Sequence, residues 1–162
     1  MKAQRSYTVT VEWLGNRGTG TSGYRDYGRG HLVTAEGKHS VEGSADRTFH
    51  GDTDRWNPEE MLLAALSQCH MLSYLHVAAT HGVVVVGYSD DAIGTMAQTT
   101  DGGGHFTAAT LRPRVTIADP DQVELAQSLH AEAARACFIA ASVNFPVGHE
   151  SVTTVAEPAS LL

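Results

Sequence analysis

The chain has 162 residues and a mass of 17.3 kDa, which fits one domain spanning residues 1–162. Hydrophobic residues make up 42% and charged residues 18%, a composition that supports a packed core and excludes disorder and collagen-like fibres. The formal charge of -7 disfavours a protein that neutralises phosphates, so no nucleic acid partner is expected.

The sequence predicts a cytoplasmic protein that does not enter a membrane. No uninterrupted apolar run reaches the roughly 18 to 20 residues of a membrane span, and the start, MKAQRSYTVTVEW, lacks the apolar stretch of a signal peptide. Two cysteines, Cys69 and Cys137, lie far apart without CxxC spacing, which argues against a zinc ribbon or a disulfide scaffold. In a reducing compartment the pair is either inert core or redox-active.

The first third of the chain predicts short strands around a glycine-rich segment. Residues 7–13 alternate and are rich in β-branched and aromatic side chains, which indicates a strand. The glycines of 15–30 suit turns and close backbone approach, and no phosphate-loop motif opens a helix there. Residues 31–35 and 39–43 predict a hairpin. Most arginines also lie in this part, and a guanidinium can hold a carboxylate or thiolate in fixed geometry.

The strongest signal predicts a helix of about 24 residues within 55–82. Asn57 can cap it, Pro58 suits its first position, Glu59 and Glu60 match the helix dipole, and Gly82 can end it. Apolar residues occupy nearly every face, so we expect this helix to be buried on most sides.

The rest of the chain predicts further strands and a second helix. Residues 83–96 and 105–117 predict two strands joined by a turn over 101–104, and Pro113 suggests an edge strand or a bulge. A second helix is expected from Asp119–Pro120 to about Cys137, followed by a turn over 139–143 and a strand over 151–155. This order predicts an α+β fold.

The long helix constrains any chemistry at Cys69. Glu59 precedes Cys69 by ten residues, about 80° short of whole turns, so the two can share a side, whereas Glu60 points to the opposite side. The rise is roughly 15 Å, so a long group such as an arginine must bridge them. Because apolar burial makes a cysteine inert, a reactive Cys69 also needs a cation. From the residues alone, both cysteines could equally be small hydrophobic core residues.

The run NPEEMLLAALSQC, from Asn57 to Cys69, resembles the signature of the OsmC/Ohr family, the osmotically inducible and organic hydroperoxide resistance proteins. In that family NPE is followed, ten residues after the Glu, by the peroxidatic cysteine, which implies that Cys69 is the reactive thiol. A second cysteine is expected late in the next helix, where Cys137 stands. The resemblance also implies an intertwined homodimer whose long central helices are wrapped by antiparallel-rich β-sheets, with active sites at the subunit interface.

The resemblance implies a thiol-dependent peroxidase that reduces organic, fatty-acid-type hydroperoxides to alcohols in oxidative-stress defence. The Cys69 thiolate would attack the O–O bond and become a sulfenic acid, which Cys137 would condense into a disulfide. An external dithiol, such as a lipoyl group of a lipoylated protein, would restore the thiols. No metal, flavin or other bound cofactor is expected.

The implied catalytic set is Cys69, Cys137, Arg25 and Glu59. Arg25 lies in GYRDYG, which matches the GGRDG segment of the Ohr branch, and Glu59 would anchor its guanidinium. The OsmC branch instead suggests Arg47, in DRTFHG. We favour Arg25, and we expect the two arginines Arg29 and Arg55 to be solvated surface charges.

Several features depart from the family pattern. The second cysteine of the family is usually followed by proline, whereas Cys137 is followed by FIAASVNFPV, which leaves its resolving role open. His70 and His76 do not belong to the family's catalytic set, and a metal site with Cys69, His76 and a third ligand is an alternative. Two further alternatives are a redox sensor or small-hydrophobic-ligand binding protein on the same dimeric fold, and a dimer whose cysteines only pack.

Overall fold

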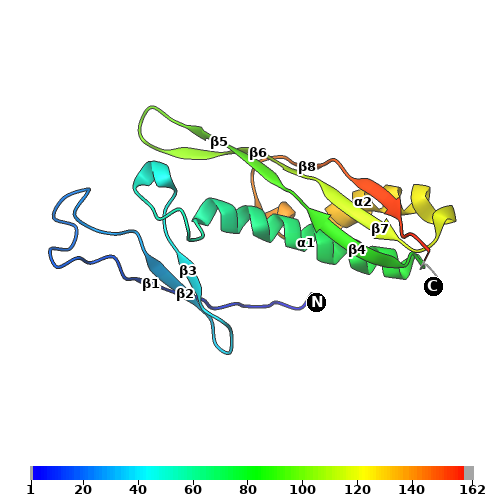
Figure 1. Cartoon of the computed structure of the whole chain (residues 1–162), viewed down its shortest axis with the longest axis horizontal. Coiled ribbons are helices and arrows are strands. Elements are labelled where there is room, and N and C mark those ends of the chain that lie inside the picture. The colour runs from blue at the N-terminus through cyan, green and yellow to red at the C-terminus, as the bar shows by residue number, and fades with distance from the viewer. Residues whose placement is uncertain (1, 159–162) are drawn as a thin grey trace. The chain divides into compact units, whose positions relative to one another are not determined.

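The computed structural model describes residues 2–158, which form two compact units, one ending at Met61 and the other beginning at Leu62. Both units combine helical segments with sheets, which confirms the predicted α+β class (Figure 1). The expected single domain over 1–162 and the intertwined dimer stay predictions.

The first unit contains an antiparallel sheet in the order β1-β2-β3. Its strands are β1 (Thr10–Trp13), β2 (His31–Thr34) and β3 (Val41–Gly43), so the predicted hairpin is confirmed and the first strand is shorter than predicted. The glycine-rich segment folds back on β1, because the Trp13 indole donates to the Gly28 carbonyl at 2.8 Å. A Cβ on Gly15 would lie 1.8 Å from that same oxygen, so only glycine permits this close approach.

The long helix α1 (Pro58–Thr80) starts and stops where its sequence predicts. Asn57 and Glu60 form a capping box: the Glu60 amide donates to Asn57 Oδ1 at 2.8 Å, and the Asn57 amide donates to Glu60 Oε2 at 3.2 Å. Gly82 follows the helix with φ +71°, a left-handed conformation that glycine adopts without strain. Both helix ends are therefore determined by local chemistry.

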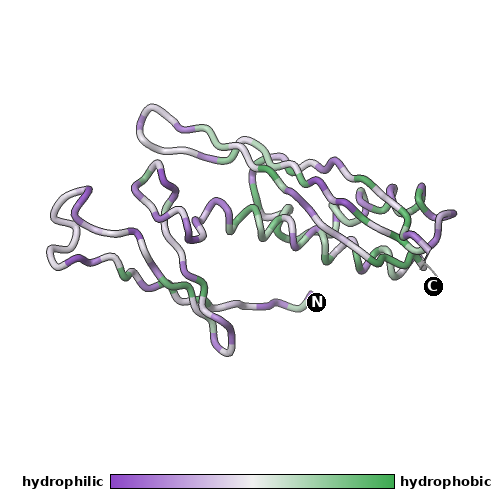
Figure 2. The backbone as a smooth tube through the Cα atoms, viewed as in Figure 1, coloured by the Kyte–Doolittle hydropathy of each residue, from purple (hydrophilic) through white to green (hydrophobic). Residues whose placement is uncertain are grey.

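Helix α1 is long and apolar enough to cross a membrane by length and composition, a test that the core helix of a soluble protein also passes. Hydrophobic stretches recur along α1 and along the neighbouring strands of the second unit (Figure 2). Five α1 side chains are buried inside that unit: Leu66, His70, Tyr74, Val77 and Ala78. Packing within the protein thus accounts for part of its apolar character.

The two strands predicted over 83–96 and 105–117 are each divided in two, so that part of the prediction is wrong. The structure has β4 (Val85–Asp90), β5 (Ile93–Gln98), β6 (Gly104–Leu111) and β7 (Pro113–Ile117). Polar groups hold the break: Asp90 accepts from the Arg112 amide at 2.6 Å, and the Arg112 side chain donates to the Asp91 carbonyl at 2.7 Å. Asp90 also accepts from Ser67 of α1 at 2.5 Å, which ties the break to the helix.

The division gives two three-stranded sheets, β4-β7-β9 and β5-β6-β8. The short strand β8 (Val147–His149) was not predicted, whereas β9 (Val152–Val155) was; they pair in parallel with β6 and β7. β7 is central in its sheet, so of the two alternatives predicted for Pro113, an edge strand or a bulge, the edge strand is wrong. Proline is tolerated there because it occupies the first position of the strand.

Helix α2 (Val123–Ala136) follows a 3₁₀ turn over Pro120–Gln122, so the predicted helix exists but its first turn is tighter than expected. The core of the second unit lies between α1, α2 and the β4-β7-β9 sheet. Its buried members come from these elements and the α1–β4 connection: Tyr74, Val77, Ala78, Val83, Val115, Ile117, Ala126, Leu129 and Ala133. Cys137 caps the C-terminal end of α2, next to this core.

Candidate active site

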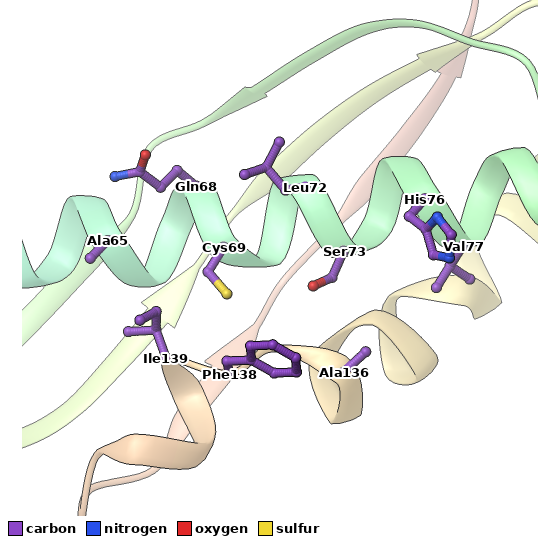
Figure 3. A pocket seen from close by; sticks show the side chains of 10 residues that line it. All are labelled: Ala65, Gln68, Cys69, Leu72, Ser73, His76, Val77, Ala136, Phe138 and Ile139. Atoms are coloured by element: carbon purple, nitrogen blue, oxygen red, sulfur yellow. The ribbon is translucent and has the colours of Figure 1, made fainter. Parts of the chain in front are cut away.

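Cys69 lies on α1 in a cavity of about 580 Å³ whose walls are mostly apolar. The cavity is built by α1, the end of α2 and the residues that follow it, and the Cys69 sulfur points toward the segment that carries Phe138 and Ile139 (Figure 3). Cys69 is half-buried, whereas the apolar side chains of Leu72 and Phe138 are 61% and 79% exposed. A small organic molecule can therefore reach the sulfur along a hydrocarbon wall.

Cys137 is 2% exposed, and both cysteines are free thiols. Burial raises the pKa of the Cys137 thiol, and a hydrogen bond with the Cys69 side chain raises it further. The Ala140 amide donates to the Cys137 sulfur at 3.4 Å, because the chain turns immediately after α2. The structure thus brings together the two cysteines that the sequence singled out, one accessible and one buried.

Glu59 lies in the first unit, in a second cavity of about 320 Å³. One of its carboxylate oxygens, Oε2, is buried and has no hydrogen-bond partner among residues 2–158. The same cavity is lined by Arg29, His31 and the aromatic side chains of Trp13 and Tyr27. A carboxylate oxygen without a donor is costly to bury, so the cavity is suited to receive a hydrogen-bond donor.

Arg29 is the arginine that shares this cavity with Glu59. Its guanidinium lies 3.9 Å from the Tyr27 ring centroid and 4.7 Å from that of Tyr24, and it donates to the backbone carbonyls of both residues. Arg25 and Arg47 are exposed, and neither lines the cavity. The family motif pointed to Arg25 because RDY resembles RDG, and sequence spacing offered no signal that Arg29 would line the same cavity as Glu59.

Three histidines gather in the second unit, and the sequence did not predict that they would meet. His70 Nε2 and His130 Nδ1 lie 3.0 Å apart within hydrogen-bonding distance, and both side chains are buried. The His149 ring centroid lies 5.7 Å from that of His70 and 5.8 Å from that of His130.

The environment keeps this pair neutral. Burial lowers the pKa of His70 to about 4, with a further contribution from His149 and a small opposing one from Asp90. Burial also lowers the pKa of His130 to about 3, and His70 and His149 lower it further. One ring therefore donates an N–H to the unprotonated nitrogen of the other at neutral pH.

The metal-site alternative with Cys69 and His76 finds no third ligand in the described part of the chain. Residues 2–158 contain no group of three histidine, cysteine, aspartate or glutamate side chains arranged to hold a metal ion. His76 lies at the cavity wall on the exposed side of α1 (Figure 3).

Comparison with known proteins points to one family. Residues 50–151 match the OsmC-like protein family, and no curated protein matches the sequence. Among solved structures, an OsmC-like protein of unknown function from Vibrio cholerae O1 biovar eltor is 28% identical, with a TM-score of 0.82 and coverage of 92% of this chain and 100% of that one. An organic hydroperoxide resistance protein from Elizabethkingia anophelis, 17% identical with a TM-score of 0.66, covers 95% and 100% of the two chains. An organic hydroperoxide resistance protein OsmC from Legionella pneumophila is 18% identical, with a TM-score of 0.64 and coverage of 95% of this chain and 100% of that one. With this match over more than half of its length, the chain belongs to the OsmC-like family.

Proposed function

We propose that the protein is a cysteine-dependent peroxidase that reduces organic hydroperoxides. The observation that supports this proposal is the cysteine pair: Cys69 is half-buried in an apolar cavity, and Cys137 is buried at the end of the neighbouring helix. Membership of the OsmC-like family and the hydroperoxide resistance proteins among similar structures support the same activity.

The reaction begins at Cys69. Its thiolate attacks the O–O bond of the hydroperoxide, the alkoxide leaves and takes up a proton to become the alcohol, and the sulfur is left as a sulfenic acid. The Cys137 sulfur then attacks the Cys69 sulfur, and the hydroxyl leaves as water with the thiol proton. A raised pKa and burial keep Cys137 a protected thiol until Cys69 is oxidised, which fits the resolving role. An external dithiol, such as a lipoyl group, reduces the disulfide, and no bound cofactor is needed.

A guanidinium from the first unit is proposed to activate Cys69, with Glu59 as its anchor. We assign this role to Arg29, which the sequence suggested would be a solvated surface charge, in place of Arg25, because Arg29 shares a cavity with the Glu59 oxygen that has no hydrogen-bond partner among residues 2–158. The guanidinium stabilises the thiolate and offsets charge on the leaving alkoxide.

We further propose that the active site is completed in a homodimer and that the protein works in the cytoplasm. Among residues 2–158, the side chains that line the Cys69 cavity include no arginine, so we infer that the cation comes from a second copy. A second copy could supply the Glu59–arginine pair, and it would also cover the apolar side chains of Leu72 and Phe138.

Peroxide consumption tests the proposal. Purified protein with cumene hydroperoxide and dihydrolipoamide should turn over many times, and Cys69→Ser should abolish consumption. Hydrogen peroxide serves as the comparison substrate, and the apolar wall predicts that it is the poorer one. Peroxide consumption that stops at one equivalent per chain would favour a redox sensor. If no peroxide is consumed, the protein is better explained as a binding protein or as a dimer whose cysteines only pack.

The cation is identified by three matched variants, Arg29→Met, Arg25→Met and Arg47→Met. We expect Arg29→Met to lower kcat/KM by about 100-fold, the typical loss of one charge-stabilising donor, and the other two to change it by less than about threefold. Thermal unfolding of each variant checks that the fold is retained. If the loss follows Arg25 or Arg47, that residue is the activating cation and our assignment is wrong.

A further inference from the structure

The buried histidines join the two helices that carry the cysteines. His70 directly follows Cys69 on α1, and His130 lies on α2 seven residues before Cys137. Seven helical residues are about 20° short of two turns, so His130 and Cys137 lie on nearly the same side of α2. The His70–His130 hydrogen bond thus connects the helices on the side of α2 that carries Cys137.

The geometry of this contact is specific. The two imidazole planes are 9° apart with centroids 5.3 Å apart, so the rings meet edge to edge through their nitrogens at 3.0 Å. Tyr74, one turn further along α1, stacks on His130 with centroids 4.1 Å apart. The Tyr74 hydroxyl donates to the Ala126 carbonyl of α2 at 2.9 Å. These two hydrogen bonds, four residues apart on each helix, define how α2 lies along α1.

Stability alone is a poor explanation for this arrangement. Both histidines are almost fully buried, at 2% and 0% exposure, and His130 Nε2 is buried without a hydrogen-bond partner among residues 2–158. Two neutral polar rings with one unsatisfied nitrogen stabilise a core less well than two leucines would. A hydrogen bond is directional, so any shift of one helix along the other that separates its two partners costs free energy. Contacts between apolar side chains do not fix the helix register in this way.

We propose that the His70–His130 hydrogen bond is a positioning contact that holds Cys137 in place to close the disulfide with Cys69. The proposal rests on the function proposed above, since disulfide closure is its resolving step. The contact acts through helix register and takes no part in the chemistry. Both histidines are therefore positioning residues.

The test measures disulfide closure without any peroxide, so that its outcome is independent of the peroxidase activity. Dipyridyl disulfide first reacts with the accessible Cys69, forming a mixed disulfide and releasing one thiopyridone. The Cys137 sulfur then attacks the Cys69 sulfur, forming the protein disulfide and releasing a second thiopyridone. Stopped-flow absorbance resolves the two phases, and Cys137→Ser should release only the first equivalent.

The decisive variant is His70→Leu/His130→Leu, which removes both partners and leaves neither unpaired. We expect it to fold, to retain the first phase, and to slow the second phase at least about tenfold, because small misplacement of reacting groups is costly. Ile117→Val, a core change on β7, is the matched control and should leave both phases unchanged.

A conservative variant separates positioning from general packing. Asparagine places a polar atom where imidazole has Nδ1, so His130→Asn keeps a hydrogen bond to His70 and should retain closure within about threefold of the wild-type rate. Should the double leucine variant misfold, His130→Asn compared with His130→Leu provides the same contrast. Closure at the wild-type rate in the leucine variants would overturn the proposal, even if the protein proves to be a peroxidase. A slow second phase in these variants would support it even if no peroxide is consumed.

Discussion

Mild acid should destabilise the wild-type protein more than a variant without the buried histidine pair. In the folded protein, burial lowers the pKa of His70 to about 4 and that of His130 to about 3. In the unfolded chain both return to about 6.5. At pH values between the folded and the unfolded pKa values, the unfolded state binds more protons than the folded state. The free energy of unfolding therefore falls as the pH falls.

The size of the effect follows from this difference. At about pH 5 an unfolded imidazole is mostly protonated and a folded one is still neutral, which costs about 2 kcal/mol of stability for each histidine relative to pH 7. Some solvation of the rings in the folded state would reduce the sum, so we expect a loss of about 2 to 4 kcal/mol for the pair. That is a large part of the 5 to 15 kcal/mol typical of a domain.

Urea unfolding at about pH 7 and pH 5, at equal protein concentration, measures this loss. The other seven of the nine histidines and all carboxylates are shared with His70→Leu/His130→Leu, so the difference between the two proteins isolates the pair. The wild type should lose about 2 to 4 kcal/mol more than the variant over this interval. Equal losses in the two proteins would refute the reasoning, because the folded pair would then bind protons as readily as the unfolded chain.

Three further predictions concern single positions. Tyr74→Phe removes the hydroxyl that donates to the Ala126 carbonyl, so it should lower the free energy of unfolding by about 0.5 to 1.5 kcal/mol, measured by urea titration. Gly82→Ala forces a side chain into the left-handed conformation at the end of α1 and should cost about 1 kcal/mol in thermal unfolding, with Gly148→Ala, whose surroundings are open, as its control. Cys137→Ser should still reduce one equivalent of cumene hydroperoxide and leave a stable sulfenic acid that dimedone traps; trapping no faster than in wild type would contradict a resolving role.

The sequence correctly predicted those elements whose ends depend on residues that are close together in the chain. Asn57, Glu60 and Gly82 set the limits of α1, and the hairpin predicted over 31–35 and 39–43 is formed by β2 and β3. The NPE motif also predicted the family, and the family resemblance predicted a second cysteine late in the next helix, where Cys137 lies. Each of these features depends on residues that are close in sequence or belong to one motif.

Features set by contacts distant in sequence could not be predicted in the same way. The break that divides the long strands depends on Asp90 accepting from the Arg112 amide, 22 residues away. Strand β8 has only three residues and forms by pairing in parallel with β6, so its sequence carries little strand signal of its own. The choice among arginines had the same limitation, since only the fold of the glycine-rich segment brings Arg29 into the cavity with Glu59.

The histidines illustrate how a correct burial pattern can leave a buried hydrogen bond unpredicted. Helical spacing places Val123, Ala126, His130, Ala133 and Cys137 on one stripe of the second helix, and four of these five are buried as such a stripe requires. Periodicity identifies a buried position, but it does not identify the partner across the helix interface. An imidazole at such a position must find a hydrogen-bond partner or leave a nitrogen unsatisfied, and His130 does both. A histidine inside an apolar stripe is therefore a reason to search the facing helix for a second polar residue, and on α1 that residue is His70, directly beside Cys69.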